Sequence, residues 1–338
     1  MFWAVVLFVV GLVLLIKGGD WFVEGATGIA ERLHIPEILI GATVVSIGTT
    51  IPEVMVSAAS AVSGHGEMAY GNAIGSVICN TSLIAAITVA FRPGKIEKKS
   101  LRMPIIFFFI AAVFYAVTAY LFGTFDRWVG IVLLIMFAAY ITVCIRQARK
   151  EMAAVPGTEK KAEEAKKELP DKEKLFGLIL MPAMLKDLIL LAVGAALIAV
   201  GANLLVDNGT IIAVGLGVPE SVVALTMVAL GTSLPELITA ITSLMKGHSD
   251  LSLGNVIGAN LFNLVLVSGV SVTLSPFEVP VSHQIAGLNT SLVVDFPVMF
   301  AVMLILTVPA LIKGKLSRWQ GILLLCIYAG FTVFQFIK

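Results

Sequence analysis

The chain has 338 residues, of which 58% are hydrophobic and 13% are charged, and its formal net charge is +1. This composition excludes a soluble globular protein, since several apolar runs reach the ~20 residues that a helix needs to cross a bilayer. A net charge this close to zero predicts no nucleic-acid partner. Cys79, Cys144 and Cys326 follow no metal-binding spacing, so we expect buried thiols.

Ten apolar segments are long enough to be membrane-spanning helices. In the first half they are 2–30, 37–63, 69–90, 103–122 and 127–146, and in the second half they are 176–206, 219–245, 251–273, 290–312 and 317–337. The first is expected to be a retained span, because no basic signal-peptide region precedes it. Spans 2–30 and 176–206 are long and show no strong packing motif, so they are the candidates for a sliding gate.

One sustained charged stretch, 147–174, separates the two halves. Its mixed signs predict a solvated, partly helical linker that is too short to be a regulatory domain. The expected organisation is therefore a first five-helix repeat at 1–146, the linker at 147–174, and a second five-helix repeat at 175–338.

Lys and Arg residues predict the orientation of the chain in the membrane. They gather in the loops after the third, fifth, seventh and ninth spans, whereas the opposite loops hold little beyond Arg127. Because basic loops stay in the cytoplasm, we expect both termini on the extracytoplasmic side of the cell membrane.

The two halves repeat each other at a shift of 183 residues. The shift places Glu53 on Glu236 and Asn80 on Asn263 without a gap, and about a third of the residues from 35 to 80 are identical. It also aligns the motif Gly-Asn-x-Ile-Gly, which starts at Gly71 and again at Gly254. Since each half carries an odd number of spans, the second half enters from the opposite face. The sequence thus predicts an all-α polytopic membrane protein whose ten transmembrane helices form two inverted five-helix repeats.

Each repeat places the same unusual stretch inside an apolar span: 48–53 reads Gly-Thr-Thr-Ile-Pro-Glu, and 231–236 reads Gly-Thr-Ser-Leu-Pro-Glu. The proline is expected to break the helix and displace a carbonyl four residues earlier. A carboxylate at membrane depth is costly and marks an ion or substrate pathway. Two such stretches at matching positions predict a transporter's binding centre near the midplane.

The residues at this centre offer oxygen ligands. Glu53 and Glu236 supply carboxylates, and Asn80 and Asn263 supply amides. Hydroxyls come from Thr49, Thr50, Thr232 and Ser233. Hard cations such as Ca2+ and Na+ require such ligands, whereas softer metals favour His and Cys. The residues alone therefore predict a cation transporter with a paired-glutamate site.

At these residues the chain resembles the Na+/Ca2+ exchangers of the cation/Ca2+ antiporter family, whose two α-repeats match 41–53 with 71–80, and 226–236 with 254–263. The resemblance implies exchange of several Na+ for one Ca2+ by alternating access, with the ions as substrates and no cofactor or obligate protein partner. It also implies the ligand set: Glu53 and Glu236 are shared by both ions, with backbone oxygens from Thr49 and Thr232. Flanking Na+ ligands are the Ser46 and Ala229 carbonyls, Thr50, Ser233 and Ser76.

Two positions depart from the family pattern. Ala259 stands where a hydroxyl matching Ser76 is common, which predicts a weaker Na+ site. Asn263 stands where K+-dependent members carry Asp, which argues against K+ co-transport.

Structural interpretations compete at several of these positions. Thr50-x-x-Glu53 and Ser233-x-x-Glu236 also fit the helix capping box, and we expect capping and ion binding to coexist. The Gly-x-x-x-Gly motifs fit helix packing as well as ion-site backbone. For the remaining charged residues we favour helix-end or interfacial roles: Glu37, Glu220, Asp20, Glu24, Asp207 and Asp295. His65 and His248 are expected on opposite faces, where they cannot share a metal.

Rival functions remain open. H+/Ca2+ or another cation exchange would suit the same scaffold, since protonated glutamates could replace Na+. An intramembrane hydrolase could use the two glutamates as acid and base, but the chain carries no nucleophile motif and the enzyme would not need inverted repeats. A channel is a further alternative, but carboxylates on both repeats favour alternating access over a channel. We therefore expect a transporter and not an enzyme.

Overall fold

The structure is a computed structural model that describes residues 2–154, 173–175, 179–181, 183–216, 231–281, 284–285 and 288–337. These residues are almost entirely helical, and eight of their helices are long and apolar enough to cross a membrane. The part of the expected span 219–245 that precedes Gly231 lies outside the described residues.

The first half contains five spans, two of which include a π-helical turn, labelled η. They are α1 (Phe2–Leu33), α2–η1–α3 (Glu37–Ile40, Gly41–Val45, Ser46–Val62), α4–η2–α5 (Gly66–Cys79, Asn80–Ala85, Ala86–Phe91), α6 (Lys98–Phe122) and α7 (Arg127–Ala154). Helix α7 continues two turns into the stretch that we expected to be linker, because the residues after Arg146 still favour a helix.

The second half follows the same plan. Its elements are α9 (Ala183–Gly215), α11 (Leu234–Lys246), α12–η3–α13 (Ser249–Phe262, Asn263–Val267, Ser268–Leu274), η4–α14 (Ser291–Asp295, Phe296–Lys313) and α15 (Arg318–Ile337). Helix α9 lies later in the chain than the expected span 176–206, because a short antiparallel pair, β3 (Glu173–Leu175) with β4 (Ile179–Met181), precedes it. Asp207, which we expected near the end of that span, therefore lies inside α9.

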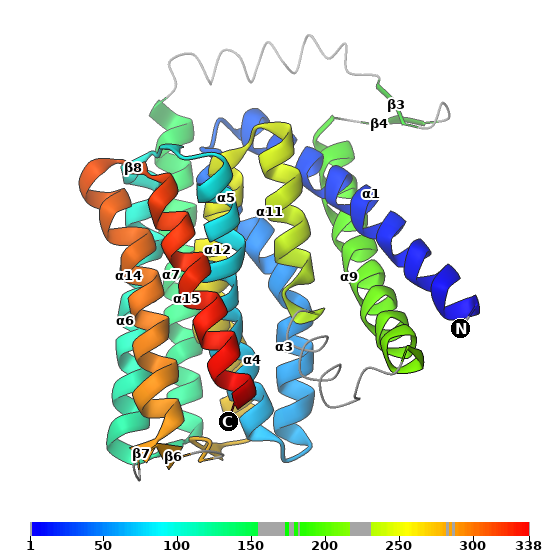
Figure 1. Cartoon of the computed structure of the whole chain (residues 1–338). Helices are drawn as coiled ribbons and strands as arrows, with labels where there is room; N and C mark the ends of the chain where they lie inside the picture. Colours follow the sequence, from blue (N-terminus) through cyan, green and yellow to red (C-terminus); the bar gives the residue numbers. More distant parts are fainter. Residues whose placement is uncertain are drawn as a thin grey trace.

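Short strands between the helices show that the two repeats are inverted. Strand β1 (Gly94–Lys95), after the third span, pairs with β8 (Lys315–Leu316), after the ninth. Strand β2 (Thr124–Phe125), after the fourth span, pairs with β5 (Phe277–Glu278), after the eighth. The loop after the third span of one repeat thus lies on the face opposite to the equivalent loop of the other repeat. The expected ten-helix inverted fold is confirmed (Figure 1).

The expected helix break at the first proline is wrong. Helix α3 runs through Pro52 without interruption, and the irregular turn of this span is η1, upstream of the proline. Neighbouring helices allow proline inside a membrane helix because they satisfy the freed backbone groups. In the second repeat the helix does begin afresh, with Ser233 as the N-cap of α11 and Pro235 in its first turn.

The two longest helices, α1 and α9, lie antiparallel at one side of the molecule (Figure 1). A Cβ at Gly18 would lie 2.9 Å from the Gly194 carbonyl oxygen, and a Cβ at Gly11 would lie 2.9 Å from the Gly201 carbonyl oxygen. These glycines recur every seven residues on both helices and let the backbones touch. The expectation that the two spans lack a packing motif is therefore wrong: they are closely packed against each other.

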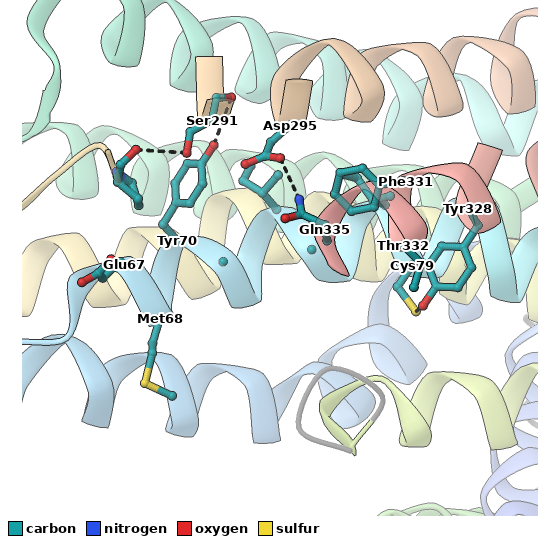
Figure 2. Close-up of a pocket in the computed structure, with 15 residues that line it drawn as sticks. Glu67, Met68, Tyr70, Cys79, Ser291, Asp295, Tyr328, Phe331, Thr332 and Gln335 are labelled. Carbon is teal, nitrogen blue, oxygen red and sulfur yellow. Dashed lines mark hydrogen bonds between the residues drawn. The ribbon is translucent and has the colours of Figure 1, made fainter. Parts of the chain in front are cut away.

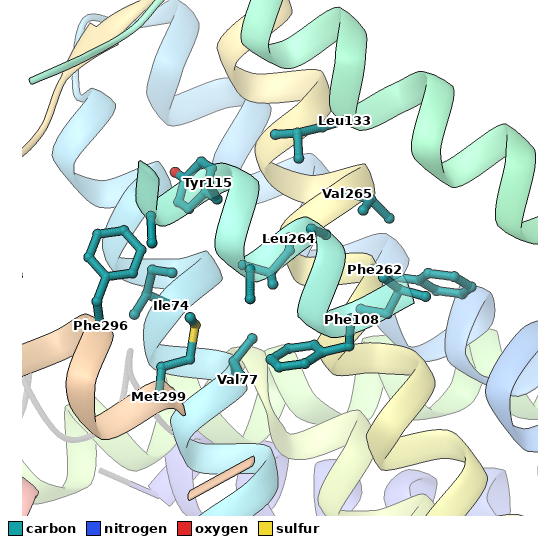
Figure 3. Close-up of a cluster of buried hydrophobic side chains, with 14 of the residues drawn as sticks. Ile74, Val77, Phe108, Tyr115, Leu133, Phe262, Leu264, Val265, Phe296 and Met299 are labelled. Carbon is teal, nitrogen blue, oxygen red and sulfur yellow. The ribbon is translucent and has the colours of Figure 1, made fainter. Parts of the chain in front are cut away.

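The remaining helices enclose an apolar core, part of which Figure 3 shows. Side chains of α4, α6, α7, η3 and α14 meet there, and the rings of Tyr115 and Phe125 stack with centroids 4.2 Å apart. From α7, the Tyr140 hydroxyl donates a hydrogen bond of 2.8 Å to the Ala42 carbonyl in η1. The core thus stabilises the π turn that precedes the first glutamate stretch.

Candidate ion-binding site

The two glutamates of the repeated stretches meet inside the protein. Glu53 on α3 and Glu236 on α11 are both fully buried, and their carboxyl groups are close enough to interact with each other. Their helices come from different repeats, and α3 packs against α11. The structure therefore brings together the pair that the 183-residue shift predicted to be equivalent.

Asn80 and Asn263 are the first residues of the equivalent π turns η2 and η3, and both are fully buried. Helix α3 packs against η3, and α11 packs against η2, so each glutamate helix borders the asparagine turn of the other repeat. Such π turns occur often at functional sites. The sequence predicted these asparagines but gave no sign of the π turns.

Eight buried side-chain oxygens of the predicted residues have no hydrogen-bond partner within the described part of the chain. They are both carboxylate oxygens of Glu53 and of Glu236, the amide oxygens of Asn80 and Asn263, and the hydroxyls of Thr50 and Ser233. Leaving such groups unpaired costs about 1–3 kcal/mol each, more when they are charged. A hard cation would satisfy them, since Ca2+ takes about six to eight oxygen ligands.

The other predicted ligands lie around this pair. Ser46 and Ser76 are buried, and Thr232 is half-buried beside Ser233. The Thr49 hydroxyl lies 3.3 Å from the amide oxygen of Asn255, which leaves its backbone oxygen as the expected ligand. Ala229 lies outside the described residues. Ala259, which stands where Ser76 stands in the first repeat, is fully buried in α12.

The asparagines of the repeated Gly-Asn-x-Ile-Gly motif position the site, which sequence reasoning missed. The Asn72 amide donates to the Ser57 hydroxyl at 2.8 Å and to the Glu53 carbonyl at 3.4 Å. Asn255, its equivalent, contacts Thr49 with its side chain and the Ser46 hydroxyl with its carbonyl. The occurrence of asparagine at the same position of both repeats was the signal in the sequence that could have pointed to Asn72 and Asn255.

The long helices cover both glutamate stretches. The Phe22 ring of α1 lies 3.2 Å from the Cβ position of Gly48, and Val206 of α9 lies 2.8 Å from that of Gly231. A Cβ would be in tight contact with Phe22 at Gly48 and would overlap Val206 at Gly231. The first glycine of each stretch therefore eases the close approach of α1 and α9.

A pocket of about 490 Å3 reaches toward the site from the face that holds β2 and β5 (Figure 2). Glu67 and Asp295 line it, and Cys79, next to Asn80, lies at the end nearest the glutamates. Gly71 and Gly75 also line this pocket, whereas Gly254 and Gly258 pack directly against Ile38 and Ala42.

Several charged residues outside the site have structural partners. The Nδ1 atom of His248 lies within hydrogen-bond distance of the Glu37 carboxylate, at 2.8 Å. The Lys246 ammonium lies 3.4 Å from the Asp20 carboxylate. The described residues hold no group of three His, Cys, Asp or Glu that could bind a metal.

Ten helices in inverted repeats, with paired buried carboxylates between them, define a polytopic membrane transporter. A family model described as sodium/calcium exchanger protein matches residues 3–146 and 186–337, and the chain belongs to that family. The chain is 30% identical to the sodium/calcium exchanger MaX1 of Methanosarcina acetivorans over 96% of both chains. It is 32% identical to the putative antiporter CaxA of Alkalimonas amylolytica over 98% of both. A solved structure of the sodium-calcium exchanger NCX_Mj matches with a TM-score of 0.78 and 31% identity, covering 97% of each chain.

Proposed function

We propose that this protein is a secondary antiporter in which Na+ moving down its gradient drives Ca2+ across the cell membrane by alternating access. The observation that carries the proposal is the pair of buried carboxylates, one from each inverted repeat, surrounded by unpartnered oxygens. Membership in the sodium/calcium exchanger family supports the identity of the two ions.

The paired carboxylates explain how one site can serve both ions. Two negative groups in a low-dielectric interior repel each other, so a cation has to lie between them or a proton has to neutralise one of them. One Ca2+ balances both charges, and several Na+ ions balance them together. The two ionic species therefore compete for Glu53 and Glu236, which couples their movements.

Helices α1 and α9 are suited to act as the moving gate. They are joined to each other by glycine contacts, and they cover Gly48 and Gly231 through Phe22 and Val206. The pocket beside Cys79 would give the ions access from the extracytoplasmic side, with Glu67 and Asp295 attracting cations at its wall.

Proton-coupled exchange is the second candidate, because the two buried carboxyl groups lie close enough to interact, and a proton on one of them would relieve their repulsion as a cation does. Proteoliposomes loaded with Na+ distinguish the two mechanisms. We expect Ca2+ uptake when an outward Na+ gradient is imposed, and background uptake when a pH gradient replaces it. Uptake driven only by the pH gradient would exclude Na+ coupling, and single-channel currents would exclude an antiporter.

A further inference from the structure

Two fully buried hydroxyls on α11, those of Thr239 and Ser243, lie outside the predicted ligand set and have no hydrogen-bond partner within the described residues. Buried hydroxyls elsewhere in the protein bond to their own helix. Thr81, Ser271 and Thr307 each donate to the carbonyl oxygen four residues earlier, at 2.7, 2.8 and 2.6 Å. We call Thr239 and Ser243 the hydroxyl pair. Because an unpaired buried hydroxyl destabilises a fold, the pair favours a role in function over one in folding.

The hydroxyl pair continues the side of α11 that carries Glu236. Thr239 and Ser243 follow Glu236 by three and seven residues, so all three lie on one face of the helix. This is the buried face, which also includes Ala240. Ser243 lies about 10 Å further along the helix axis than Glu236. The two hydroxyls therefore extend from the proposed ion site toward the C-terminal end of α11.

A pocket of about 540 Å3 lies at that end of α11, and residues of β1 and β8 line it. We call it the β1–β8 pocket, and it lies on the face opposite to the pocket beside Cys79. Gly247, the residue after α11, is part of its lining. Its charged lining residues are Glu37, Asp250 and Arg92, so acidic groups outnumber basic ones there. Such a lining favours cations over anions.

Polar and apolar side chains separate the β1–β8 pocket from the hydroxyl pair. The Thr88 hydroxyl at the pocket lies 3.3 Å from the hydroxyl of Ser252, which is fully buried in α12. Helix α11 packs against both α5 and α12, which carry these two hydroxyls (Figure 1). Val89 and Leu253 also line the pocket, and they belong to the same apolar cluster as Ala240. The hydroxyl pair is thus shut off from solvent here, as a path that is closed on this face requires.

The internal repeat does not account for the hydroxyl pair. The 183-residue shift places Thr239 on Val56, an exposed apolar residue. It places Ala240 on Ser57, whose hydroxyl is bonded to the Asn72 amide at 2.8 Å. The first half therefore holds its hydroxyl with a partner, whereas the second half carries an unpartnered one. The pair is a feature of the second half alone and lies outside the ligand set that both halves share.

We propose that the hydroxyl pair lines the path by which cations pass between Glu236 and the β1–β8 pocket, and that it forms a resting position for a partly dehydrated cation on this path. The inference rests on the proposed antiport and adds residues on the route to the face expected to be cytoplasmic. Hydroxyl oxygens are suitable ligands for Na+ and Ca2+. Because the pair is neutral, it binds a cation more weakly than the two carboxylates do, so the ion passes on.

Matched hydroxyl deletions test the proposal. The test variants are Thr239→Val, Ser243→Ala and the two combined. The controls are Thr307→Val and Ser271→Ala, which remove buried hydroxyls that are bonded to their own helix. Thermal unfolding of the full-length protein and Ca2+ exchange in proteoliposomes are measured for each variant.

Removal of the hydroxyl pair should leave the unfolding midpoint equal to or above that of the wild type, since no hydrogen bond is lost, whereas the controls should lower it slightly. Ca2+ exchange should fall about threefold in each single test variant and about tenfold in the double variant, and should stay within about twofold of the wild type in the controls. Wild-type exchange in the double variant would overturn the proposal, whatever its unfolding midpoint.

Thiol labelling of Ser243→Cys tests the path separately from the antiport. A small cationic methanethiosulfonate that does not cross the membrane is added to one side of sealed vesicles, and labelling is measured by mass spectrometry on the peptide that contains residue 243. Lys315→Cys on β8 marks the face, and Thr307→Cys is the buried control.

We expect residue 243 to be labelled only from the face of β8, at a rate that Ca2+ lowers about threefold or more, while residue 307 stays unlabelled. Labelling only from the opposite face, or no labelling in a variant that still exchanges Ca2+, would overturn the proposal. If the wild-type protein showed no Na+/Ca2+ exchange, the proposed function would fail, and labelling of residue 243 would still decide whether the path exists.

Discussion

At the residue scale, the proposed exchange depends on the two buried carboxylates, Glu53 and Glu236. Glu53→Gln or Glu236→Gln keeps the shape of the side chain but removes one charge from the site. Loss of a charged ligand costs about 1.5–3 kcal/mol, so we expect Ca2+ transport in proteoliposomes to fall about 10- to 100-fold at subsaturating Ca2+. Both variants should remain folded, since a neutral amide is cheaper to bury than an unpaired carboxylate.

Glu31→Gln is the matched control, because Glu31 is exposed near the end of α1 and touches no predicted ligand. It should transport Ca2+ at the wild-type rate. Substantial Ca2+ exchange by Glu53→Gln, measured as isotope uptake at the same protein density, would count against the site.

Ala259→Ser tests the asymmetry between the repeats. Ala259 is fully buried at the position that matches Ser76. A hydroxyl there adds one oxygen ligand of the kind that Na+ prefers. We expect the Na+ concentration for half-maximal exchange to fall about two- to tenfold, with a smaller change in the Ca2+ dependence. An unchanged Na+ dependence would show that this position does not border a Na+ site.

The candidate site residues could be selected from the sequence because the repeat marked them as equivalent. Glu53, Asn80 and their partners stand at identical positions in both halves, and polar groups at membrane depth are costly enough to be informative. The repeat also marked Asn72 and Asn255 as equivalent, but their contacts could not be predicted, because these depend on which helices pack together: Asn72 bonds to Ser57 within its own repeat, and Asn255 bonds to Thr49 of the other repeat. Spacing within one span carries no information about such contacts.

At the element scale, the contact between α1 and α9 shows where sequence reasoning fails. Glycines at intervals of seven are visible in each helix, but they form a packing motif only when the two helices are known to lie antiparallel. The π turns η1, η2 and η3 are equally hidden, since no residue type marks them. Helix positions, by contrast, followed from hydropathy, and the expected ends were wrong mainly where charged segments continue a helix, as in α7.

Gly18→Val tests the packing of this helix pair. A Cβ at Gly18 would lie 2.9 Å from the Gly194 carbonyl oxygen and from the Leu197 side chain, so the helices have to separate. Overpacking of this kind costs about 1–3 kcal/mol. We expect a lower thermal unfolding midpoint and slower exchange, whereas Gly330→Val, at a glycine with no neighbour within 4 Å, should change neither. Equal unfolding midpoints for the two variants would contradict the close packing.

A cross-link tests whether the helix pair moves against the rest of the protein. The Cβ position of Gly19 on α1 lies 3.6 Å from the Thr242 Cβ on α11, a separation that suits a disulfide. In a Cys326→Ser background, Gly19→Cys with Thr242→Cys should stop Ca2+ exchange under oxidation and recover it on reduction. Each single cysteine variant is the control. Exchange that continues through complete cross-linking would exclude movement of α1 relative to α11.

At the scale of the whole molecule, the strand pairs fix which loops share a face. Strands β1 and β8 join the loops after the third and ninth spans, and β2 and β5 join the loops after the fourth and eighth. The ends of the described chain lie on the side away from β8 (Figure 1). Inverted repeats thus place equivalent parts of the two halves on opposite faces, a geometry that suits the alternating access we propose.

Reporter fusions test which side of the membrane each face of the protein occupies. Arg92, Lys98, Arg102, Arg146 and Lys246 lie on the face of β1 and β8, and basic residues stay cytoplasmic. We therefore expect a C-terminal fusion to alkaline phosphatase to be active in cells and a C-terminal fusion to green fluorescent protein to be dark. The fluorescent protein inserted within the linker 147–174 should be bright. The strand pairs fix which loops share a face, so the position of one terminus determines the orientation of all loops. A bright C-terminal fusion would therefore contradict the predicted orientation and place all five of these basic residues outside the cell.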